Sequence, residues 1–478
     1  MSPRVCHPVC IEMRHTPIFD AELLQRHDRP GPRYTSYPPA PRFRTAFGEE
    51  QLRAQALRSD KATIRRALSL YLHVPFCFGP CFYCGCNRII TRDRTKGEHY
   101  AERLRQEIGL VAPLFDASRE VVQLHLGGGT PNFLGVPTLE RLMGTLHGSF
   151  RLSPSTDRDF SIELDPRSVP EEYPAALTRL GFNRVSLGVQ DFDPYVQEAV
   201  NRIQNVEQTL SLVDACRDSG MKSVNVDLIY GLPHQTLEGF RRTLRTVISA
   251  RPDRVAVYGY AHLPDVFKPQ RRIDASALPG PEVRLQLLGL AIEELCLSGY
   301  RYIGMDHFAL PEDDLVKSQE AGTLQRNFMG YTTHADCDLI GLGMSAISHI
   351  GDSFSQSFRE LGAWEASVAA GRLPIWRGLA LDADDRVRGA VIGQLMCQGR
   401  IEIAAIERRY GIHFAGYFGV ALERLRPHEA DGLVHVEAEA ICVTARGQLL
   451  LRSLAMCFDR YLDQQDGAAT SPRFSQVV

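Results

Sequence analysis

Hydrophobic and polar residues repeat in a regular order between about residue 69 and residue 265. Six segments alternate apolar and polar positions with a period of two, which predicts β-strands. They are Ser69–Phe76, Val121–Gly128, Asp159–Asp165, Arg184–Gln190, Ser223–Tyr230 and Arg254–His262. Apolar residues between them recur at helical spacing, as in Leu139, Leu142, Met143 and Leu146. Such strand–helix repeats predict parallel strands with helices on at least one face.

The polar positions of these strands indicate the kind of sheet. Strands of a doubly wound sheet are covered by helices on both faces and are almost wholly apolar. A complete (β/α)8 barrel fills its interior with branched apolar side chains. Here one face of most strands is polar, as at Gln123 and His125 in the second strand. We therefore predict an α/β fold with a wide, partial (β/α)6 TIM-like barrel whose polar interior holds a polar ligand.

The C-terminal part has a different pattern. Residues 380–463 have helical spacing followed by a predicted β-hairpin formed by Leu433–Val436 and Ile441–Thr444. That order resembles a winged helix. We therefore predict a smaller, mostly helical, winged-helix-like C-terminal domain over 376–478. The barrel and its extension would then occupy 69–375.

The first 68 residues form a third unit, an N-terminal segment over 1–68. It contains the turn-rich stretch GPRYTSYPP (Gly31–Pro39), whose two tyrosines are costly to expose. We predict that this stretch covers the barrel mouth. Residues 1–28 contain no recognisable site motif and are expected to be dispensable.

Composition narrows the function classes. The chain has 478 residues, of which 44% are hydrophobic and 23% charged, and a net charge of −3. This near balance argues against a nucleic-acid partner, and Asp382, Asp384 and Asp385 interrupt any basic face on the winged-helix-like domain. No apolar run approaches the roughly 18 residues that span a bilayer. The N-terminus has no signal-peptide core, so we expect a cytoplasmic protein.

Four of the twelve cysteines lie within one short loop, CFGPCFYCGC. Cys77, Cys81 and Cys84 have the spacing C-x3-C-x2-C directly after the first strand. Zinc sites usually combine two C-x2-C pairs and four ligands. Three thiolates on one exposed loop suit a 4Fe–4S cube with one iron left open, and are preferred here to zinc or a buried cysteine-rich turn. Cys86 follows too closely to be a fourth ligand and is interpreted as a neighbour of the site.

Further polar groups lie at the same ends of the strands. GGGTP (Gly127–Pro131) follows the second strand, and consecutive glycines allow a ligand to approach the backbone. Glu163, Gln190 and Asp227 project from the third, fourth and fifth strands toward the interior. Polar side chains on adjacent strands favour a ligand with amines and hydroxyls.

These motifs together carry a resemblance. The chain resembles radical S-adenosylmethionine (SAM) enzymes and, within them, the family of oxygen-independent coproporphyrinogen III oxidases, also called coproporphyrinogen dehydrogenases, over nearly its whole length. The segments that carry it are GPRYTSYPP, HVPFCFGPCFYCGCN, HLGGGTPNFL, IELDPR, SLGVQDFDPYVQEAVNR, VDLIYGLPHQT, YAHLP, GYRYIGMDHFA, RNFMGYTT, GMSAIS and MCFDRYL. The N-terminal extension with Cys6 and Cys10 departs from the pattern, so we assign this pair no function.

The resemblance implies cofactor-binding residues. Cys77, Cys81 and Cys84 would hold a 4Fe–4S cluster whose open iron binds SAM. The residues implied to contact this SAM are Tyr71, Gly128, Glu163 and Ile347. Those implied for a second SAM are Tyr83, Gly129, Thr130, Gln190, Arg202, Asp227 and Ala261.

The resemblance also implies the reaction. Two propionate side chains of coproporphyrinogen III would be oxidatively decarboxylated to vinyl groups, giving protoporphyrinogen IX in anaerobic heme and porphyrin biosynthesis. The enzyme, an oxidoreductase, would need an external electron donor and acceptor and would act as a monomer. Because the substrate has four carboxylates, cationic groups should surround it, and Arg33, His307 and Arg326 are the candidates.

Two other functions are compatible with parts of the pattern. A non-catalytic, heme-carrying relative would keep the cysteine loop, but such relatives typically lack the CGCN extension and the long N-terminal segment, both present here. A winged-helix regulator would use the C-terminal domain alone. Anaerobic assay for protoporphyrinogen separates the three.

Overall fold

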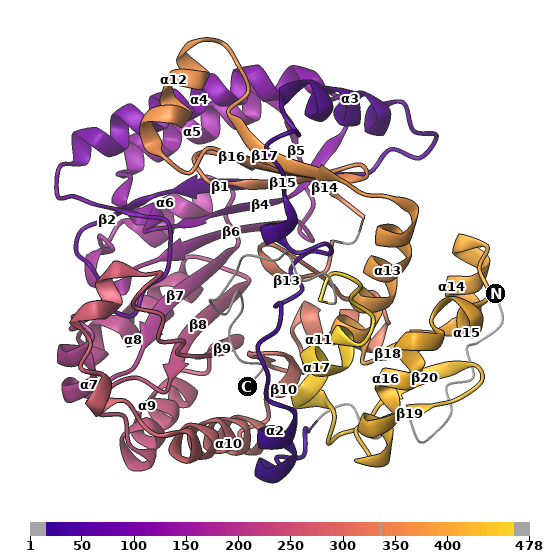
Figure 1. Ribbon diagram of the computed structural model, residues 1–478. Helices are drawn as coiled ribbons and strands as arrows, with labels where there is room; N and C mark the ends of the chain where they lie inside the picture. The colour runs from indigo at the N-terminus through magenta and orange to yellow at the C-terminus, as the bar shows by residue number, and fades with distance from the viewer. Residues whose placement is uncertain (1–15, 335, 463–478) are drawn as a thin grey trace.

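Six parallel strands form the centre of the computed structural model, which describes residues 16–334 and 336–462. The strands are β1 (Leu68–Val74), β4 (Glu120–Gly128), β6 (Asp159–Leu164), β7 (Arg184–Gln190), β8 (Ser223–Tyr230) and β9 (Arg254–Gly259). They lie side by side in this order, each parallel to the next. The predicted partial (β/α)6 barrel is therefore confirmed (Figure 1).

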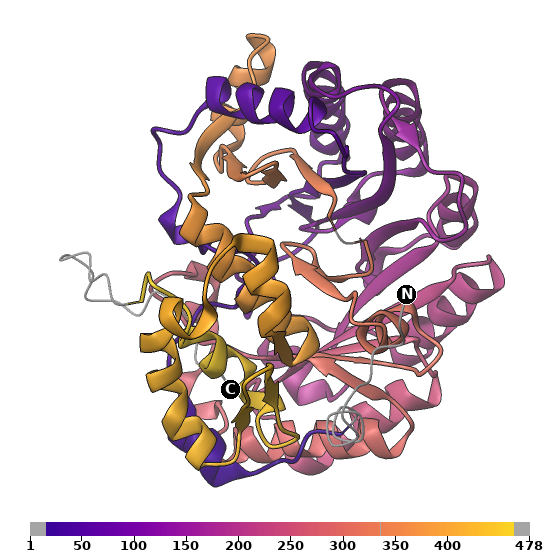
Figure 2. The same ribbon diagram turned by 90° about the vertical axis from the view of Figure 1, so that its right-hand side faces the viewer.

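Helices cover the outer face of these strands (Figures 1 and 2). They are α4 (Arg94–Val111), α5 (Val136–Ser149), α6 (Tyr173–Arg179), α7 (Pro194–Ala199), α8 (Val206–Asp218), α9 (Leu237–Ser249) and α10 (Pro281–Leu297). The predicted stripe on α5 is buried as expected, since Leu139, Leu142 and Leu146 are fully inaccessible. Each such leucine contributes about 1.5–3 kcal/mol by leaving water.

The opposite face of the strands points inward and is polar. In β6, Phe160 and Ile162 are buried against the helices, whereas Ser161 and Glu163, which alternate with them, are partly exposed. In β1, Tyr71 is partly exposed between fully buried leucines. The interior is thus not packed with branched apolar residues, which keeps polar side chains accessible inside the barrel.

The sheet continues beyond the six predicted strands at both edges and has thirteen strands in all. Next to β1 lie β14 (Asp338–Leu342), which is parallel to it, and then antiparallel β15 (Ile347–Ile350), β16 (Ser353–Ser357) and β17 (Ile375–Ala380). Next to β9 lie antiparallel β11 (His307–Ala309) and β10 (Arg301–Gly304). Short β5 (Arg151–Leu152) pairs with β4. Figure 1 shows α3 (Glu49–Asp60) and α12 (Leu361–Ala369) over the added strands.

A charged network closes the amino ends of the strands. Arg184, the first residue of β7, donates to Asp314 at 2.6 Å, and Arg254, the first residue of β9, donates to Asp313 at 2.9 Å. Both aspartates belong to the start of α11 (Asp314–Glu320), which Asp313 caps. The hairpin of β12 (Gln325–Asn327) and β13 (Gly330–Thr332) follows. The open face of the strands is therefore at their carboxyl ends.

The C-terminal domain confirms the predicted hairpin and adds to it. Its helices are α13 (Ala383–Gln398), α14 (Ile403–Tyr410), α15 (Phe414–Tyr417), α16 (Gly419–Ala430) and α17 (Leu451–Met456). The hairpin is β19 (Val434–Val436) with β20 (Ala440–Val443), and an unpredicted strand, β18 (Arg400–Glu402), pairs with β20. The expectation that the hairpin ends the domain is wrong, because α17 follows it.

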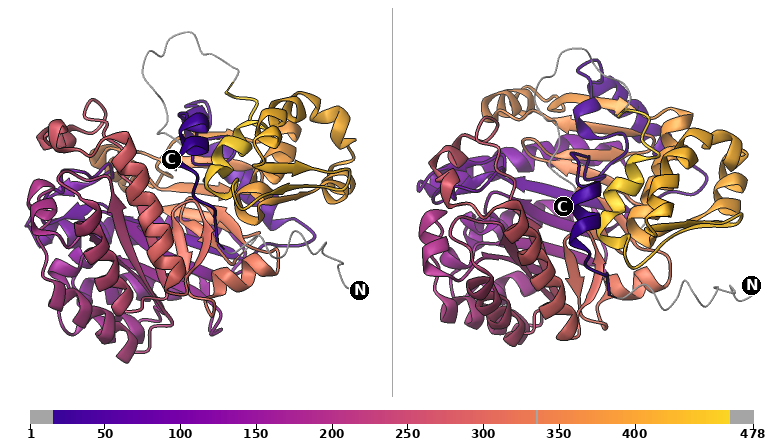
Figure 3. Two further views of the ribbon diagram at one scale, coloured as in Figure 1. Left: turned by 90° about the horizontal axis from the view of Figure 1, so that it is seen from below. Right: turned by 60° about the horizontal axis from the view of Figure 1, so that its bottom comes forward.

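The N-terminal segment joins this domain to the barrel (Figure 3). Helix α2 (Ala21–His27) docks on the C-terminal domain, where Asp20 pairs with Arg446 at 2.6 Å and His27 with Asp431 at 2.8 Å. In Figure 1 the indigo segment then crosses the open side of the barrel toward α3. Tyr34 and Tyr37 are buried, as the sequence predicts.

Shorter elements complete the described residues. They are β2 (Phe76–Cys77), which pairs with β3 (Ile89–Ile90), and the 3-10 helices η1 (Ala40–Arg42), η2 (Ala112–Leu114), η3 (Pro131–Phe133), η4 (Pro166–Ser168), η5 (Lys268–Arg272), η6 (Ala275–Ala277) and η7 (Gln448–Leu450). Within residues 16–334 and 336–462, no helix has the length and apolar character needed to cross a membrane. Cys6 and Cys10 lie outside the described residues.

Candidate active site

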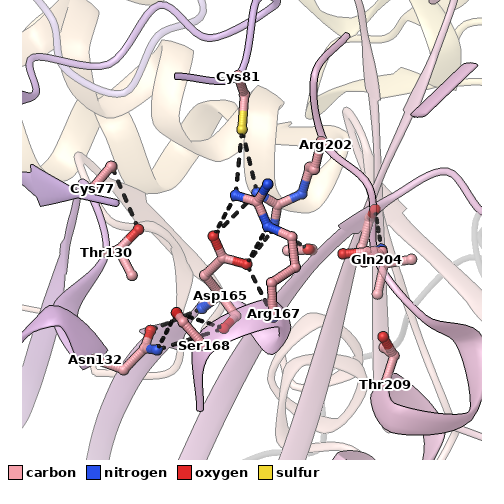
Figure 4. Close-up of polar contacts among 12 residues, drawn as sticks. Cys77, Cys81, Thr130, Asn132, Asp165, Arg167, Ser168, Arg202, Gln204 and Thr209 are labelled. Atoms are coloured by element: carbon pink, nitrogen blue, oxygen red, sulfur yellow. Dashed lines mark hydrogen bonds and ion pairs between the residues drawn. The ribbon is translucent and has the colours of Figure 1, made fainter. Parts of the chain in front are cut away.

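The cysteine loop leaves the barrel at the carboxyl end of β1, between the short strands β2 and β3. The Cys77 thiol accepts a hydrogen bond from Thr130 Oγ1 at 3.4 Å. The Cys81 thiol faces two guanidinium groups, with Arg202 Nη1 at 3.4 Å and Arg167 Nη2 at 3.7 Å (Figure 4). Both guanidinium groups thus place positive charge next to a sulfur that is predicted to bind iron.

The pKa of the third thiol, Cys84, is shifted in the opposite direction to that of Cys77. A hydrogen bond from Cys86, acting against burial and aided by the charge of Arg88, lowers the pKa of Cys84 to about 6. Burial instead raises the pKa of Cys77 to about 11. Arg88 also donates to the carbonyl oxygens of Cys84 and Cys81, each at 3.0 Å, and so fixes the curvature of the loop.

The donor set fits a 4Fe–4S cube. Cys77, Cys81 and Cys84 are free thiols on one loop, and Cys86 beside them is exposed. Across the part of the chain that the structure describes, no three His, Cys, Asp or Glu side chains converge on a point that would hold one metal ion. Three cysteine thiolates that each bind a different iron are the ligands that such a cube needs, and one loop supplies all three here.

Asp165 organises the guanidinium groups behind Cys81, a role that the sequence analysis missed. It accepts hydrogen bonds from Arg167 Nη2 at 2.6 Å and from Arg202 Nη2 at 3.2 Å. Burial raises the pKa of Asp165, but the charges and hydrogen bonds of both arginines outweigh this and hold it below its usual value. Arg202, which the resemblance assigns to SAM, also donates to the carbonyl of Gly188 and is buried in this network. The signal for Asp165 in the sequence is its position as a polar residue directly after β6, in the motif IELDPR.

The glycines after β4 are needed by the protein itself. Gly128 has a φ of +117°, and a Cβ there would lie 2.5 Å from the His73 ring. A Cβ on Gly129 would lie 2.7 Å from the backbone of Pro75. The motif was predicted to let a ligand approach the backbone; the structure shows that it first lets β1 and β4 approach each other.

Glu163, Tyr71 and Gly128 are brought together on the inner face. Glu163 accepts from the Gly128 N–H at 3.0 Å and contacts His125 Nε2 at 3.2 Å, and its side chain stays 43% exposed. Tyr71 stacks on His125 with ring centroids 5.9 Å apart. Burial raises the pKa of Glu163, but hydrogen bonds from His125 and Gly128 bring it below its usual value. The carboxylate is therefore charged and open to the interior.

Asp227 lies farther along the same face. It accepts from Ser186 at 3.0 Å and from Asn225 at 2.9 Å, and burial raises its pKa to about 6. Gln190, at the end of neighbouring β7, has a φ of +70°, a conformation that costs energy for a residue with a Cβ. A strained polar residue at this end of the barrel is typical of functional sites.

Three further residues implied by the resemblance lie on loops. Tyr83 and Ala261 share one partner, because Gln270 Nε2 donates to their carbonyl oxygens at 2.9 and 3.1 Å. Ile347 begins β15, just after a turn in which the Gly343 N–H donates to Glu107 at 2.7 Å. The cysteine loop and the ends of β9 and β14 are thus each anchored by a buried polar side chain.

The substrate candidates form a second group beyond β9. Arg33 pairs with Asp306, and Arg326 donates to the carbonyl of Arg33. Burial lowers the pKa of His307 to about 4, which favours the neutral ring near pH 7 as long as no anion is bound; its role as a cationic contact stays a prediction. Its Nδ1 has no hydrogen-bond partner among the described residues.

Tyr258 lies next to the substrate candidate Arg33. Tyr258 belongs to β9 and is partly exposed. The Arg33 guanidinium lies 5.9 Å from its ring centroid. Burial raises the pKa of its hydroxyl well above the usual value, and the carboxylates of Asp227 and Asp306 act in the same direction. Arg33 of the N-terminal segment therefore lies next to Tyr258 in β9, the strand beside β8 and its SAM candidate Asp227.

Comparison with known proteins agrees with this arrangement. The family profile of the Radical SAM superfamily matches residues 71–247, and that of the HemN C-terminal domain matches residues 381–450. The oxygen-independent coproporphyrinogen III oxidase of Pseudomonas aeruginosa is 49% identical over 467 residues, covering 98% of this chain and 100% of that protein. That of Escherichia coli is 46% identical and covers 96% of this chain and 98% of that protein.

A solved structure shows the same fold. The structure described as coproporphyrinogen III oxidase (HemN) from Escherichia coli, a radical SAM enzyme, superposes with a TM-score of 0.88 at 45% identity, covering 93% of this chain and all of that one. Radical SAM enzymes carry a 4Fe–4S cluster and SAM, which the cysteine loop and the polar interior fit. The chain therefore belongs to the family of oxygen-independent coproporphyrinogen III oxidases, oxidoreductases of the radical SAM superfamily that act in heme biosynthesis.

Proposed function

We propose that this chain decarboxylates two propionate side chains of coproporphyrinogen III to vinyl groups, giving protoporphyrinogen IX. The observation that carries the proposal is that the barrel combines a cysteine loop with cationic partners and a separate cationic group. Arg202 and Arg167 face Cys81, whereas Arg33 lies over the Tyr258 ring of β9 and its carbonyl accepts a hydrogen bond from Arg326. Cytoplasmic location, a monomeric state, three working units over 1–68, 69–375 and 376–478, and external electron donors and acceptors belong to the same proposal.

Cys77, Cys81 and Cys84 would hold the cluster, and Arg202 and Arg167 would stabilise its Cys81 ligand. When bound, the cluster and SAM would supply radical chemistry for hydrogen abstraction. The protein's own part is to exclude water and to fix the target carbon, because a primary carbon radical attacks many groups.

Charged groups on the strands suit SAM. Glu163 is ionised and accessible, so it would accept hydrogen bonds from ribose hydroxyls or an ammonium group. Tyr71, Gly128 and Ile347 would contact the same molecule. We propose a second SAM near Tyr83, Gly129, Thr130, Gln190, Arg202, Asp227 and Ala261. The burial cost at Asp227 supports this, since a bound cation or hydroxyl would offset it.

The experiment is an anaerobic assay on the full chain reconstituted with iron and sulfide. Coproporphyrinogen III, SAM and a chemical reductant are added, and the porphyrins are oxidised and separated by chromatography. Protoporphyrin with a transient tricarboxylate intermediate is expected. Cys81→Ser should lose both iron and product, because serine is a poor ligand for iron–sulfur centres. Cys86→Ser is the matched control and should retain about four irons per chain, as a three-cysteine cube requires.

The alternatives have distinct outcomes. Tight heme binding without SAM-dependent decarboxylation would identify a heme-carrying relative and refute the proposal. Loss of the cluster in Cys86→Ser to the same degree as in Cys81→Ser would refute the ligand assignment. SAM stoichiometry, measured by equilibrium dialysis with the SAM analogue S-adenosylhomocysteine as competitor, decides between one and two molecules.

A further inference from the structure

A carboxylate, Asp306, lies beside the two arginines Arg33 and Arg326. Asp306 stands in the turn between β10 and β11, and its Oδ2 pairs with Arg33 Nη2. The two residues are 273 positions apart, so the pair connects the N-terminal segment directly to the barrel.

The turn that carries Asp306 is firmly held by its backbone. The Asp306 carbonyl accepts from the Val257 N–H at 2.7 Å, and the Met305 carbonyl accepts from Tyr302 Oη at 2.8 Å. Loss of the side-chain pair would therefore leave the turn in place. The N-terminal segment around Arg33 is also held without this pair. Arg452 donates to the carbonyls of Gly31 and Pro32, and Arg326 donates to the carbonyl of Arg33.

Arg33 is the accessible partner of a pair that makes a single contact. Its side chain is 39% exposed, whereas that of Asp306 is 16% exposed. Only one nitrogen of the guanidinium fork contacts one oxygen of Asp306. Accessible single-contact pairs are weak, while a carboxylate that meets both nitrogens of the fork binds more strongly. The Arg33 guanidinium can therefore exchange Asp306 for another carboxylate.

The surroundings favour an incoming anion. Burial lowers the pKa of Arg452 to about 10; the charges of Arg33 and Arg326 act in the same direction, and Asp306 acts against them. The bonds of Arg326 and Arg452 named above go to carbonyl oxygens, which carry no net charge. His307, next to Asp306, keeps an unpartnered Nδ1.

We propose that Asp306 is a specificity-determining residue that occupies the carboxylate position on Arg33 until a carboxylate of the substrate replaces it. A molecule without a suitably placed carboxylate cannot displace Asp306, so it leaves the N-terminal segment bound to the turn. A carboxylate-bearing porphyrinogen exchanges one ion pair for another and takes the place next to Tyr258. This inference rests on the proposed function for the identity of the ligand.

The test measures binding of coproporphyrin III, the oxidised tetracarboxylate that is not turned over, to the full chain by fluorescence titration. The variants are Asp306→Asn, which removes the internal competitor, and Asp306→Glu, which keeps its charge. Asp352→Asn is the matched control, because Asp352 pairs with Arg386 at 2.7 Å on an exposed surface. A porphyrin with two carboxylates is titrated in parallel, and thermal unfolding confirms that each variant folds.

Asp306→Asn should bind coproporphyrin III about 3- to 10-fold more tightly than the parent, the range for releasing one weak ion pair. Asp306→Glu and Asp352→Asn should match the parent. Weaker or unchanged binding in Asp306→Asn would overturn the proposal, because Asp306 would then contact the ligand or only brace the fold. Failure of Asp306→Asn to fold would overturn it too, since a displaceable group cannot be essential to the fold.

Turnover is measured separately on the same proteins. Normal decarboxylation by the parent without tighter binding in Asp306→Asn contradicts this inference alone. Absence of decarboxylation with tighter binding in Asp306→Asn contradicts the proposed function and leaves carboxylate exchange standing.

Discussion

Replacing Asp165 by asparagine should destabilise the protein strongly, because Asp165 separates two guanidinium groups beneath the cysteine loop. The Arg167 contacts are 2.9 and 2.6 Å, and the Arg202 contacts are 3.2 and 3.4 Å. The side chains of Asp165 and Arg202 are only 12% and 7% exposed. Leaving buried charges uncompensated costs about 3–5 kcal/mol. Since Arg167 is 24% exposed, we expect the lower end, about 3 kcal/mol.

The assay is chemical unfolding of the iron-free protein, followed by iron analysis after reconstitution. Asp165→Asn should unfold at lower denaturant concentration and hold less iron, because Arg202 is then free to move away from Cys81. Asp165→Asn combined with Arg167→Gln should recover part of the loss, since one of the two unpaired charges is removed. Asp352→Asn, from an exposed pair, should change stability by under about 0.5 kcal/mol. A loss below about 1 kcal/mol in Asp165→Asn, or strict additivity in the double variant, would refute the electrostatic account.

Two further predictions concern pH and the N-terminus. The pKa of Asp227 is raised from 3.8 to about 6, so the folded state favours its protonated form, and the stability it contributes below pH 4 is lost as pH rises through 6. This loss is at most about 3 kcal/mol in the SAM-free protein. In unfolding curves between pH 4 and 7, Asp227→Asn should not show this loss of stability. Its SAM binding should weaken by about 1–3 kcal/mol. An identical pH profile of stability in the variant and the parent would contradict the reasoning. Deleting 1–16 should preserve the melting temperature, whereas deleting 1–28 removes α2 with buried Leu23 and Leu24 and should cost about 3–6 kcal/mol. Equal melting temperatures for the two truncations would restore the expectation that 1–28 is dispensable.

The barrel could be predicted from the sequence because its strands obey a simple rule. Each of the six has one face against helices and one toward the interior, so alternation is visible without knowledge of the partners. The added strands do not follow that rule. Strand β16 reads SFSQS, yet Ser353 and Ser355 are each 1% exposed, because the strand is buried on both faces while its composition is polar. Nothing in such a segment distinguishes it from a loop.

The site was predictable where its chemistry is local. The cysteine spacing alone predicts the cluster loop. Glu163 and Asp227 are recognisable as polar residues in strands that alternate polar and apolar positions. Arg33 was proposed from its charge, but its partner Asp306 lies 273 residues away, and no sequence pattern joins them. The lowered pKa of His307 could not be predicted for the same reason, since it is set by burial among side chains from distant segments. Sequence identifies titratable groups, whereas their charge depends on the completed fold.

The position of the N-terminal segment has a consequence for synthesis on the ribosome. Tyr34 donates to Asp459, a residue made 425 positions later. At roughly 5–20 residues per second, the segment waits about 20–85 s for that partner. The cysteine loop and the six strands emerge well before then, so a nascent chain can form the radical-generating half of the site early. The contacts of Tyr34 are completed only after α17 and Asp459 leave the ribosome, so the N-terminal segment is fixed in place long after it is made.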